Sequence, residues 1–181
     1  MTFLVVAAGH SGTKFLASQL AMAEGWTVLH EPNSVISARI AARRFLRADN
    51  YGEVNSFLLT AARRIPSDRR AVLLRNPYDL AKSIACTGHL NAAMYVRECI
   101  SMLDNLARDG WQTIRFPDIT SDPAYVVRCA RRLGIATLRE SDVDVATRVN
   151  KHRHGLDEPP VVEFDPPTVR EFDAFTRRYR L

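Results

Sequence analysis

The start of the chain imposes the strongest constraint on the fold, because an apolar run is followed at once by a glycine turn. Residues 2–8 form a continuous apolar run, which is typical of a parallel strand buried on both faces. The turn that follows reads Gly9-His10-Ser11-Gly12-Thr13-Lys14. A helix is predicted from about Thr13, since Phe15, Leu16 and Leu20 recur on one face. This strand–turn–helix unit indicates a sheet of parallel strands joined by helices.

The rest of the chain continues this alternation. Further strands are predicted at residues 26–29, 71–74 and 112–116. Helices are predicted at residues 34–46, 52–64, 91–108, 121–133 and 168–179, and from residue 77 onwards. The pattern predicts an α/β protein, specifically a three-layer α/β/α sandwich with a mainly parallel central sheet. The 181 residues are expected to form a single domain over residues 1–181, with its ligand at the carboxyl ends of the strands.

Composition excludes several classes of protein. The three cysteines are widely spaced and form no CxxC pair, so neither disulfides nor a zinc site is expected. No signal-peptide pattern and no apolar run of about 20 residues is present, so we expect a cytoplasmic protein without a membrane span. The net charge of +5 is carried mostly by arginine, which suits phosphate or nucleic acid but can also reflect base composition of the genome.

The glycine turn has the features of an anion-binding loop. Its two glycines permit a tight backbone path in which successive N–H groups point inward, and the following helix adds its positive end. Ser11 and Thr13 add hydroxyl donors, and His10 or Lys14 can add positive charge. The turn is not a Walker A loop, because GxxxxGK[ST] is absent, and the strand at residues 71–74 is followed by Arg75 rather than by an acidic residue.

A second segment follows the strand at residues 71–74. Asn76 is expected to cap a helix, with Pro77 at its first position and Asp79 in its first turn. Arg75 leaves the end of the strand and can hold a phosphate through two parallel hydrogen bonds, and Ser83 lies about two turns into the helix. The alternative interpretation is a surface arginine paired with Asp79 and a serine that faces solvent.

Together these segments resemble the two cofactor signatures of the sulfotransferases that use 3′-phosphoadenosine 5′-phosphosulfate (PAPS). The loop at residues 10–14 is similar to their 5′-phosphosulfate loop, with His10 in place of the usual lysine or arginine and Lys14 in place of a threonine. The segment from Arg75 to Ser83 matches the 3′-phosphate motif RxPxDxxxS at every defined position. Residues 113–123 are similar to a third, chiefly structural, motif, so that the resemblance spans roughly residues 2–135.

The resemblance implies the P-loop NTPase-like sulfotransferase fold and an enzyme. Such an enzyme moves a sulfuryl group from PAPS to a hydroxyl or amine acceptor by in-line displacement, without a metal, and releases 3′,5′-adenosine bisphosphate (PAP). The resemblance assigns the 5′-phosphosulfate to His10, Ser11, Gly12, Thr13 and Lys14. It also makes Lys14 and His10 candidate catalytic residues, because positive charge there would offset the charge that grows on the leaving oxygen. It assigns the 3′-phosphate to Arg75 and Ser83.

The acceptor must lose a proton, and a general base typically contributes 10²- to 10⁴-fold to such a step. Glu31, which follows the strand at residues 26–29, is the first candidate, and His30 is the second. The alternative is two polar residues that close a strand before Pro32. By the same resemblance, Glu53 is expected to shape the acceptor side or to cap a helix. His89, just past Ser83, either lines the same rim or lies in a solvated loop.

A basic stretch near the C-terminus, residues 149–155, resembles the family's loop that closes over the 3′-phosphate. Lys151 and Arg153 are its candidate contacts, with a merely solvated loop as the alternative. The acceptor is expected to be a glycan, a lipid-linked group or a small alcohol. Two other functions stay open: a P-loop-type nucleoside or small-molecule kinase, and a non-catalytic basic protein that binds nucleic acid. We do not expect a nucleic-acid partner.

Overall fold

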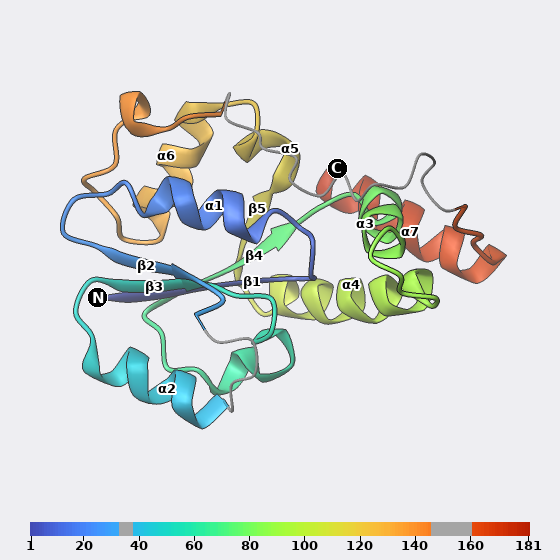
Figure 1. Cartoon of the computed structure of the whole chain (residues 1–181), viewed down its shortest axis with the longest axis horizontal. Coiled ribbons are helices and arrows are strands. Elements are labelled where there is room, and N and C mark those ends of the chain that lie inside the picture. Colours follow the sequence, from blue (N-terminus) through green and yellow to red (C-terminus); the bar gives the residue numbers. More distant parts are fainter. Residues whose placement is uncertain (33–37, 146–160) are drawn as a thin grey trace.

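The computed structural model describes residues 1–32, 38–145 and 161–181. Its centre is a sheet of five parallel strands in the order β2-β3-β1-β4-β5 (Figure 1). The strands are β1 (Thr2–Ala7), β2 (Thr27–His30), β3 (Tyr51–Val54), β4 (Arg69–Leu74) and β5 (Gln112–Arg115). This arrangement confirms the predicted α/β class with a parallel central sheet.

Helices cover both faces of the sheet. One face carries α1 (Thr13–Leu20), α5 (Phe116–Ile119) and α6 (Pro123–Arg132), and the other carries α2 (Ala38–Arg47), the 3-10 helix η1 (Leu59–Arg64) and α4 (Ala92–Arg108). The helices α3 (Pro77–Ala85) and α7 (Pro166–Tyr179) pack with α4, and η2 (Glu140–Asp142) is a short 3-10 turn near α6. No helix in these ranges is long and apolar enough to cross a membrane.

The burial of β1 explains why its sequence is a continuous apolar run. Alternate side chains of a strand point to opposite faces of the sheet. Leu4 and Val6 accordingly lie in the core on the α4 side, whereas Phe3 and Val5 lie in the core on the α1 side. Each of these four side chains is completely buried. A central strand between two helical layers therefore needs apolar residues at every position.

The prediction of a helix at residues 52–64 is wrong. Its first part is strand β3, which pairs with β1 on one side and β2 on the other, and only residues 59–64 are helical, in the 3-10 form. Gly52 is needed in this strand because a Cβ atom there would lie 2.1 Å from the ring of Phe3 on the neighbouring strand. A four-residue strand that contains glycine and glutamate has little intrinsic β propensity, so tertiary packing decides its structure.

The sequence analysis placed Glu53 on the acceptor side or at a helix cap. In the structure Glu53 instead lies inside strand β3. Its carboxylate is fully buried in β3 and accepts three hydrogen bonds. The donors are Arg44 Nε at 2.9 Å, the Tyr51 hydroxyl at 2.6 Å and Asn55 Nδ2 at 2.9 Å. The guanidinium also forms an ion pair at 2.8 Å, and burial together with the hydrogen bond to Glu53 raises the pKa of Tyr51. A buried charge without such partners would be very costly.

The topology places the polar segments at one edge. Because all strands are parallel, the loops that follow them leave the sheet at the same side. The loop after β1 begins at Ala8, and Arg75 follows β4, the strand beside β1. Glu31 and Asn55 follow β2 and β3, on the other side of β1. The predicted site residues after β1, β2 and β4 thus lie on one rim, as expected.

We predict that Arg44→Met lowers the free energy of unfolding by about 3–5 kcal/mol, because it leaves the Glu53 carboxylate buried without its cation. The matched control is Arg43→Met, which alters an exposed neighbour and should cost less than about 0.5 kcal/mol. Urea denaturation measures both values. The double variant Arg44→Met/Glu53→Met should recover much of the loss. Equal effects of the two single variants would contradict this account of the ion pair.

Candidate functional site

The loop after β1 adopts the backbone conformation that an anion-binding turn requires. His10 and Gly12 have positive φ angles of 63° and 86°, and α1 starts immediately afterwards at Thr13. The N–H of Leu16 donates to the carbonyl of Gly12 at 3.0 Å and closes the first helical turn. The N–H groups at the start of this helix therefore have no intrahelical acceptors and are available to a ligand.

Gly12 is required for a second reason. A Cβ atom on Gly12 would lie 2.3 Å from the ring of Phe116, which is the first residue of α5. The ring thus supports the loop from the side of β5. The sequence motif at residues 113–123 was predicted to be structural, and this contact shows one structural task that its phenylalanine performs.

Arg75 lies against the same loop. Its Nη1 donates to the carbonyl oxygen of His10 at 2.7 Å, and its guanidinium carbon lies 4.9 Å from the centre of the Phe116 ring. Burial lowers the pKa of Arg75, whereas the nearby Asp79 carboxylate raises it. The arginine is accordingly held beside the glycine turn by one hydrogen bond and one cation–π contact.

Two buried polar atoms in this region have no hydrogen-bond partner within the described residues. They are the Ser11 hydroxyl oxygen and the Arg75 Nε atom, and the Ser11 residue is only 1% exposed. A buried hydroxyl or guanidinium N–H without a partner costs about 1–3 kcal/mol, or more when it is charged. Ser11 and Arg75 belong to the two loops that the sequence assigned to phosphate binding. Their orphaned atoms indicate that this region is built to receive an acceptor-rich ligand.

The helix that follows Arg75 begins as the sequence predicts. The Asn76 side chain accepts a hydrogen bond from the N–H of Tyr78 at 3.0 Å, and Pro77 occupies the first helical position. Ser83 lies in α3 and is partly exposed. The Tyr78 hydroxyl donates to Asp173 Oδ1 at 2.8 Å, so the first turn of α3 is also attached to α7.

On the other side of β1, His30 contacts Thr13 at the end of the glycine turn, and Glu31 lies beside His30. His30 Nε2 lies 2.9 Å from the Thr13 hydroxyl and 3.6 Å from Glu31 Oε2. Burial lowers the pKa of His30 from its ordinary value of 6.5; Glu31 raises it and Lys14 lowers it. The imidazole is therefore neutral at pH 7. The structure places Thr13, Lys14, His30 and Glu31 at one rim, as the sequence predicts for residues that follow parallel strands, although β3 lies between β1 and β2.

Glu31 is held in place by a residue that the sequence did not indicate. The backbone N–H of Ser56 donates to Glu31 Oε1 at 3.2 Å, and the Ser56 hydroxyl donates to the same oxygen. Glu31 itself has a positive φ angle of 42°, a strained conformation for a residue with a side chain. Ser56 could not be found from sequence because the predicted helix at residues 52–64 gave it no position next to Glu31.

Tyr95 is a second residue that the sequence did not indicate. A Cβ atom on Gly9 would lie 3.4 Å from the Tyr95 hydroxyl oxygen, so the tyrosine reaches the first residue of the glycine turn. Burial is the main cause that raises the pKa of Tyr95 to about 12, so its hydroxyl stays protonated. The ring of His89 stacks on that of Tyr95 with centroids 6.3 Å apart. Tyr95 is not among the buried residues that form the apolar face of α4. The helical spacing of apolar residues in the sequence therefore did not single it out.

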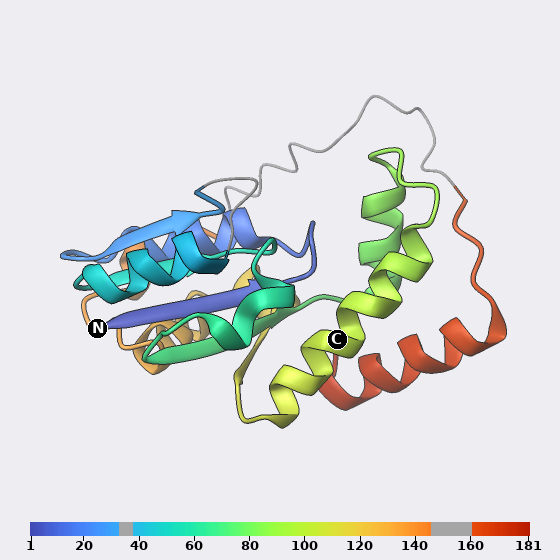
Figure 2. The same ribbon diagram turned by 90° about the horizontal axis from the view of Figure 1, so that it is seen from below.

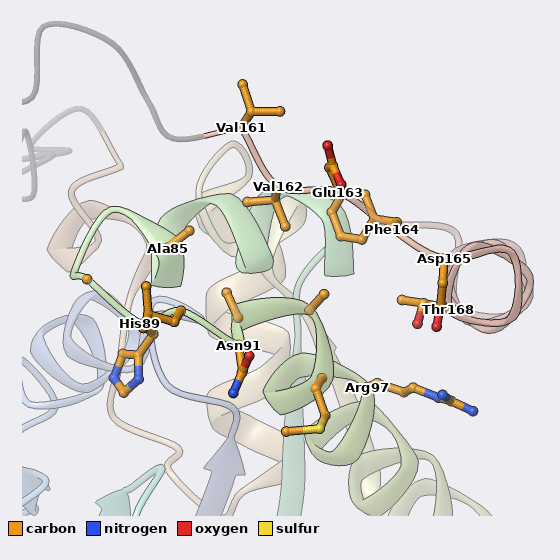
Figure 3. Close-up of a pocket in the computed structure, with 15 residues that line it drawn as sticks. Ala85, His89, Asn91, Arg97, Val161, Val162, Glu163, Phe164, Asp165 and Thr168 are labelled. Carbon is orange, nitrogen blue, oxygen red and sulfur yellow. Dashed lines mark hydrogen bonds between the residues drawn. The ribbon is translucent and has the colours of Figure 1, made fainter.

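A cavity of about 980 Å³ opens beside His89, between the C-terminal end of α3, the start of α4 and the segment that leads into α7 (Figure 3). Leu90, Met94 and Val161 contribute exposed apolar side chains to its wall. His89, which lines this cavity, stacks on Tyr95, and the Tyr95 hydroxyl lies close to Gly9 of the glycine turn. Lys151 and Arg153 lie outside the described residues.

The fold is that of the sulfotransferases. The sulfotransferase domain of the Synechococcus PCC 7002 olefin synthase is similar over 97% of this chain and 94% of that domain, with a TM-score of 0.64 and 15% sequence identity. Mouse sulfotransferase SULT7A1, solved in complex with PAP, is similar over 99% of this chain and 84% of its own, with a TM-score of 0.58 and 15% identity. No protein-family model and no curated protein sequence matches the chain. The resemblance stated from the sequence is thus confirmed at the level of the fold.

We predict that Gly12→Ala lowers the free energy of unfolding more than Gly88→Ala does. Both glycines have a φ angle of 86°, but a Cβ atom at Gly88 would meet nothing within 4 Å. The comparison therefore isolates the clash with Phe116, for which overpacking costs about 1–3 kcal/mol. Urea denaturation of the two variants measures the difference. Equal destabilisation would show that the Phe116 ring moves aside without cost.

Proposed function

We propose that this protein is a PAPS-dependent sulfotransferase that transfers a sulfuryl group to a hydroxyl or amine acceptor. One observation carries the proposal: the orphaned Ser11 hydroxyl and Arg75 Nε lie in two loops that meet at one rim. A nucleotide with phosphate groups at both its 3′ and 5′ positions would satisfy donors from both loops. The sulfotransferase fold and the PAP in the SULT7A1 structure support the same ligand class.

The 5′ end of the cofactor would be held at the start of α1. The N–H groups of the turn, the Ser11 and Thr13 hydroxyls and the positive end of the helix dipole all favour a phosphosulfate there. Lys14 lies exposed in the first turn of α1 and adds positive charge next to His30. His10 takes the position of the family's lysine or arginine, and in our proposal Lys14 supplies the positive charge of that residue.

The 3′-phosphate would be held by Arg75 and Ser83. The Nε atom of Arg75 is the unsatisfied donor for this contact, while its Nη1 remains bonded to His10. Ser83 follows on the helix that Asn76 caps, and adds a hydroxyl donor. Lys151 and Arg153 complete this subsite in the proposal, on the strength of the sequence resemblance alone.

Bound PAPS supplies the sulfuryl group, and the protein must take the proton of the acceptor. We assign this role to Glu31. Ser56 fixes its Oε1 atom, and its Oε2 atom faces the ring of His30. His30 stays the alternative, but its Nε2 is already bonded to the Thr13 hydroxyl. The Tyr95 hydroxyl, which stays protonated and lies beside Gly9, is a donor toward the same rim.

A phosphoryl-transferring kinase fits the same geometry less well. P-loop NTPases hold their magnesium ion with an acidic residue at a strand end. In this chain β4 ends at Leu74 and is followed by Arg75, whose side chain reaches the loop after β1. A cation in this position favours a ligand that is bound through its anionic groups directly.

We predict that the protein binds PAP without magnesium and in preference to ATP, as measured by calorimetry. Arg75→Ala should weaken PAP binding by about 10- to 100-fold, because a hydrogen bond to a charged group contributes roughly 1.5–3 kcal/mol. The control is Arg69→Ala at the opposite end of the same strand, which should leave affinity unchanged. A preference for magnesium-ATP, or equal behaviour of the two variants, would refute the proposal.

We further predict that Glu31→Gln lowers kcat by about 10²- to 10⁴-fold while PAP affinity stays the same. Transfer of radiolabelled sulfuryl from PAPS to a panel of alcohols measures kcat. His30→Gln should have a smaller effect, and since His30 is neutral at pH 7, that effect should be constant above this pH. The reverse order of the two variants would assign the base to His30.

A further inference from the structure

The exposed face of α2 carries a row of three arginines, Arg39, Arg43 and Arg47. They are four residues apart and therefore follow one another along the helix. The helix contains no acidic residue, and within the part of the chain that the structure describes none of the three forms an ion pair. The fourth arginine of α2, Arg44, turns inward to Glu53. We call Arg39, Arg43 and Arg47 the arginine row.

Several exposed arginines elsewhere on this protein do have carboxylate partners. Arg97 pairs with Glu171, Arg128 with Asp122, and Arg178 with Asp104. In the arginine row, by contrast, three like charges stand close together on one helix, which destabilises the helix slightly. An anionic ligand would remove this repulsion.

The arginine row leads to the candidate site. α2 connects the parallel neighbours β2 and β3, so it runs antiparallel to them, and its first residues lie toward the carboxyl edge of the sheet (Figures 1 and 2). Arg39 is therefore at the end nearest the rim that carries Glu31, and Arg47 is at the far end. With a rise of 1.5 Å per residue, the row extends about 12 Å away from that rim.

We propose that the arginine row binds a linear polyanionic glycan, one end of which reaches Glu31 as the acceptor. The argument is charge complementarity: guanidinium groups bind carboxylate and sulfate oxygens through paired hydrogen bonds. Charges spaced about 6 Å apart along a single helix match a chain with repeated anionic groups. Such a glycan also carries hydroxyl groups, so its role as acceptor rests on the proposed function.

The same face is poorly suited to other polyanions. Single-stranded nucleic acids bind through aromatic side chains on which bases stack, and the exposed residues of α2 include none. A membrane-surface helix inserts a broad apolar face into the lipid. In α2 that face, with Ala41 and Phe45, is buried in the protein core, and Ile40 and Leu46 alone are apolar and exposed.

The test uses a size-defined heparin oligosaccharide as the probe and a neutral maltooligosaccharide as the ligand control. An oligonucleotide and anionic lipid vesicles are measured as the competing polyanions. Calorimetry at increasing salt concentration compares the wild-type protein with the triple variant Arg39→Ser/Arg43→Ser/Arg47→Ser. The charge-matched control is Arg131→Ser/Arg132→Ser/Arg139→Ser, at exposed positions on the opposite face of the sheet. PAP affinity is measured for every protein.

The triple variant of the arginine row should bind heparin at least tenfold more weakly, with the slope of log K against log salt reduced by roughly two to three. The control triple variant should change affinity by less than threefold, and PAP affinity should be the same in all proteins. Equal losses in both triple variants would overturn the proposal, as would dependence on the row only for an oligonucleotide or for anionic vesicles. Failure of PAP binding with retained heparin binding would instead refute the proposed function.

Discussion

The hydrogen bond from Arg75 to the carbonyl of His10 joins the two loops on which the proposed site depends. His10 follows β1 and Arg75 follows β4, and the two strands are parallel neighbours in the sheet. A tight left-handed turn at His10 and Gly12 exposes the helix N-terminus, and the Phe116 ring packs against both the loop and the guanidinium. The strand pairing places the two loops side by side, and this hydrogen bond fixes the Arg75 side chain against the glycine turn.

Two buried hydrogen-bond donors beside this bond have no partner in the described part of the chain, and our proposal rests on them. Arg75 uses Nη1 for the loop carbonyl while its Nε remains buried without a partner within the described residues, as does the Ser11 hydroxyl. Folded proteins pair most buried polar atoms. In our proposal these two donors, which are costly to leave unpaired, are kept ready for an anionic ligand.

The local features of this site could be predicted from the sequence because each depends on a few neighbouring residues. The glycine turn, the helix start at Thr13 and the cap at Asn76 all follow from short-range stereochemistry. Strand β3 could not be predicted, because the burial of Glu53 there depends on hydrogen bonds from Arg44, Tyr51 and Asn55. The mistaken helix then hid Ser56, and with it the support of Glu31. Tyr95 reaches Gly9 from a distant helix, a contact that no local pattern encodes.

The central claim is that the two loops hold the two ends of one nucleotide, and a crystal structure with PAP tests it most directly. The account predicts that the 5′-phosphate accepts hydrogen bonds from the backbone N–H groups of the glycine turn and from the hydroxyl groups of Ser11 and Thr13. It predicts the 3′-phosphate within hydrogen-bond distance of Arg75 Nε and Ser83. PAP bound at another place, with Ser11 Oγ and Arg75 Nε still unpaired, would contradict the account.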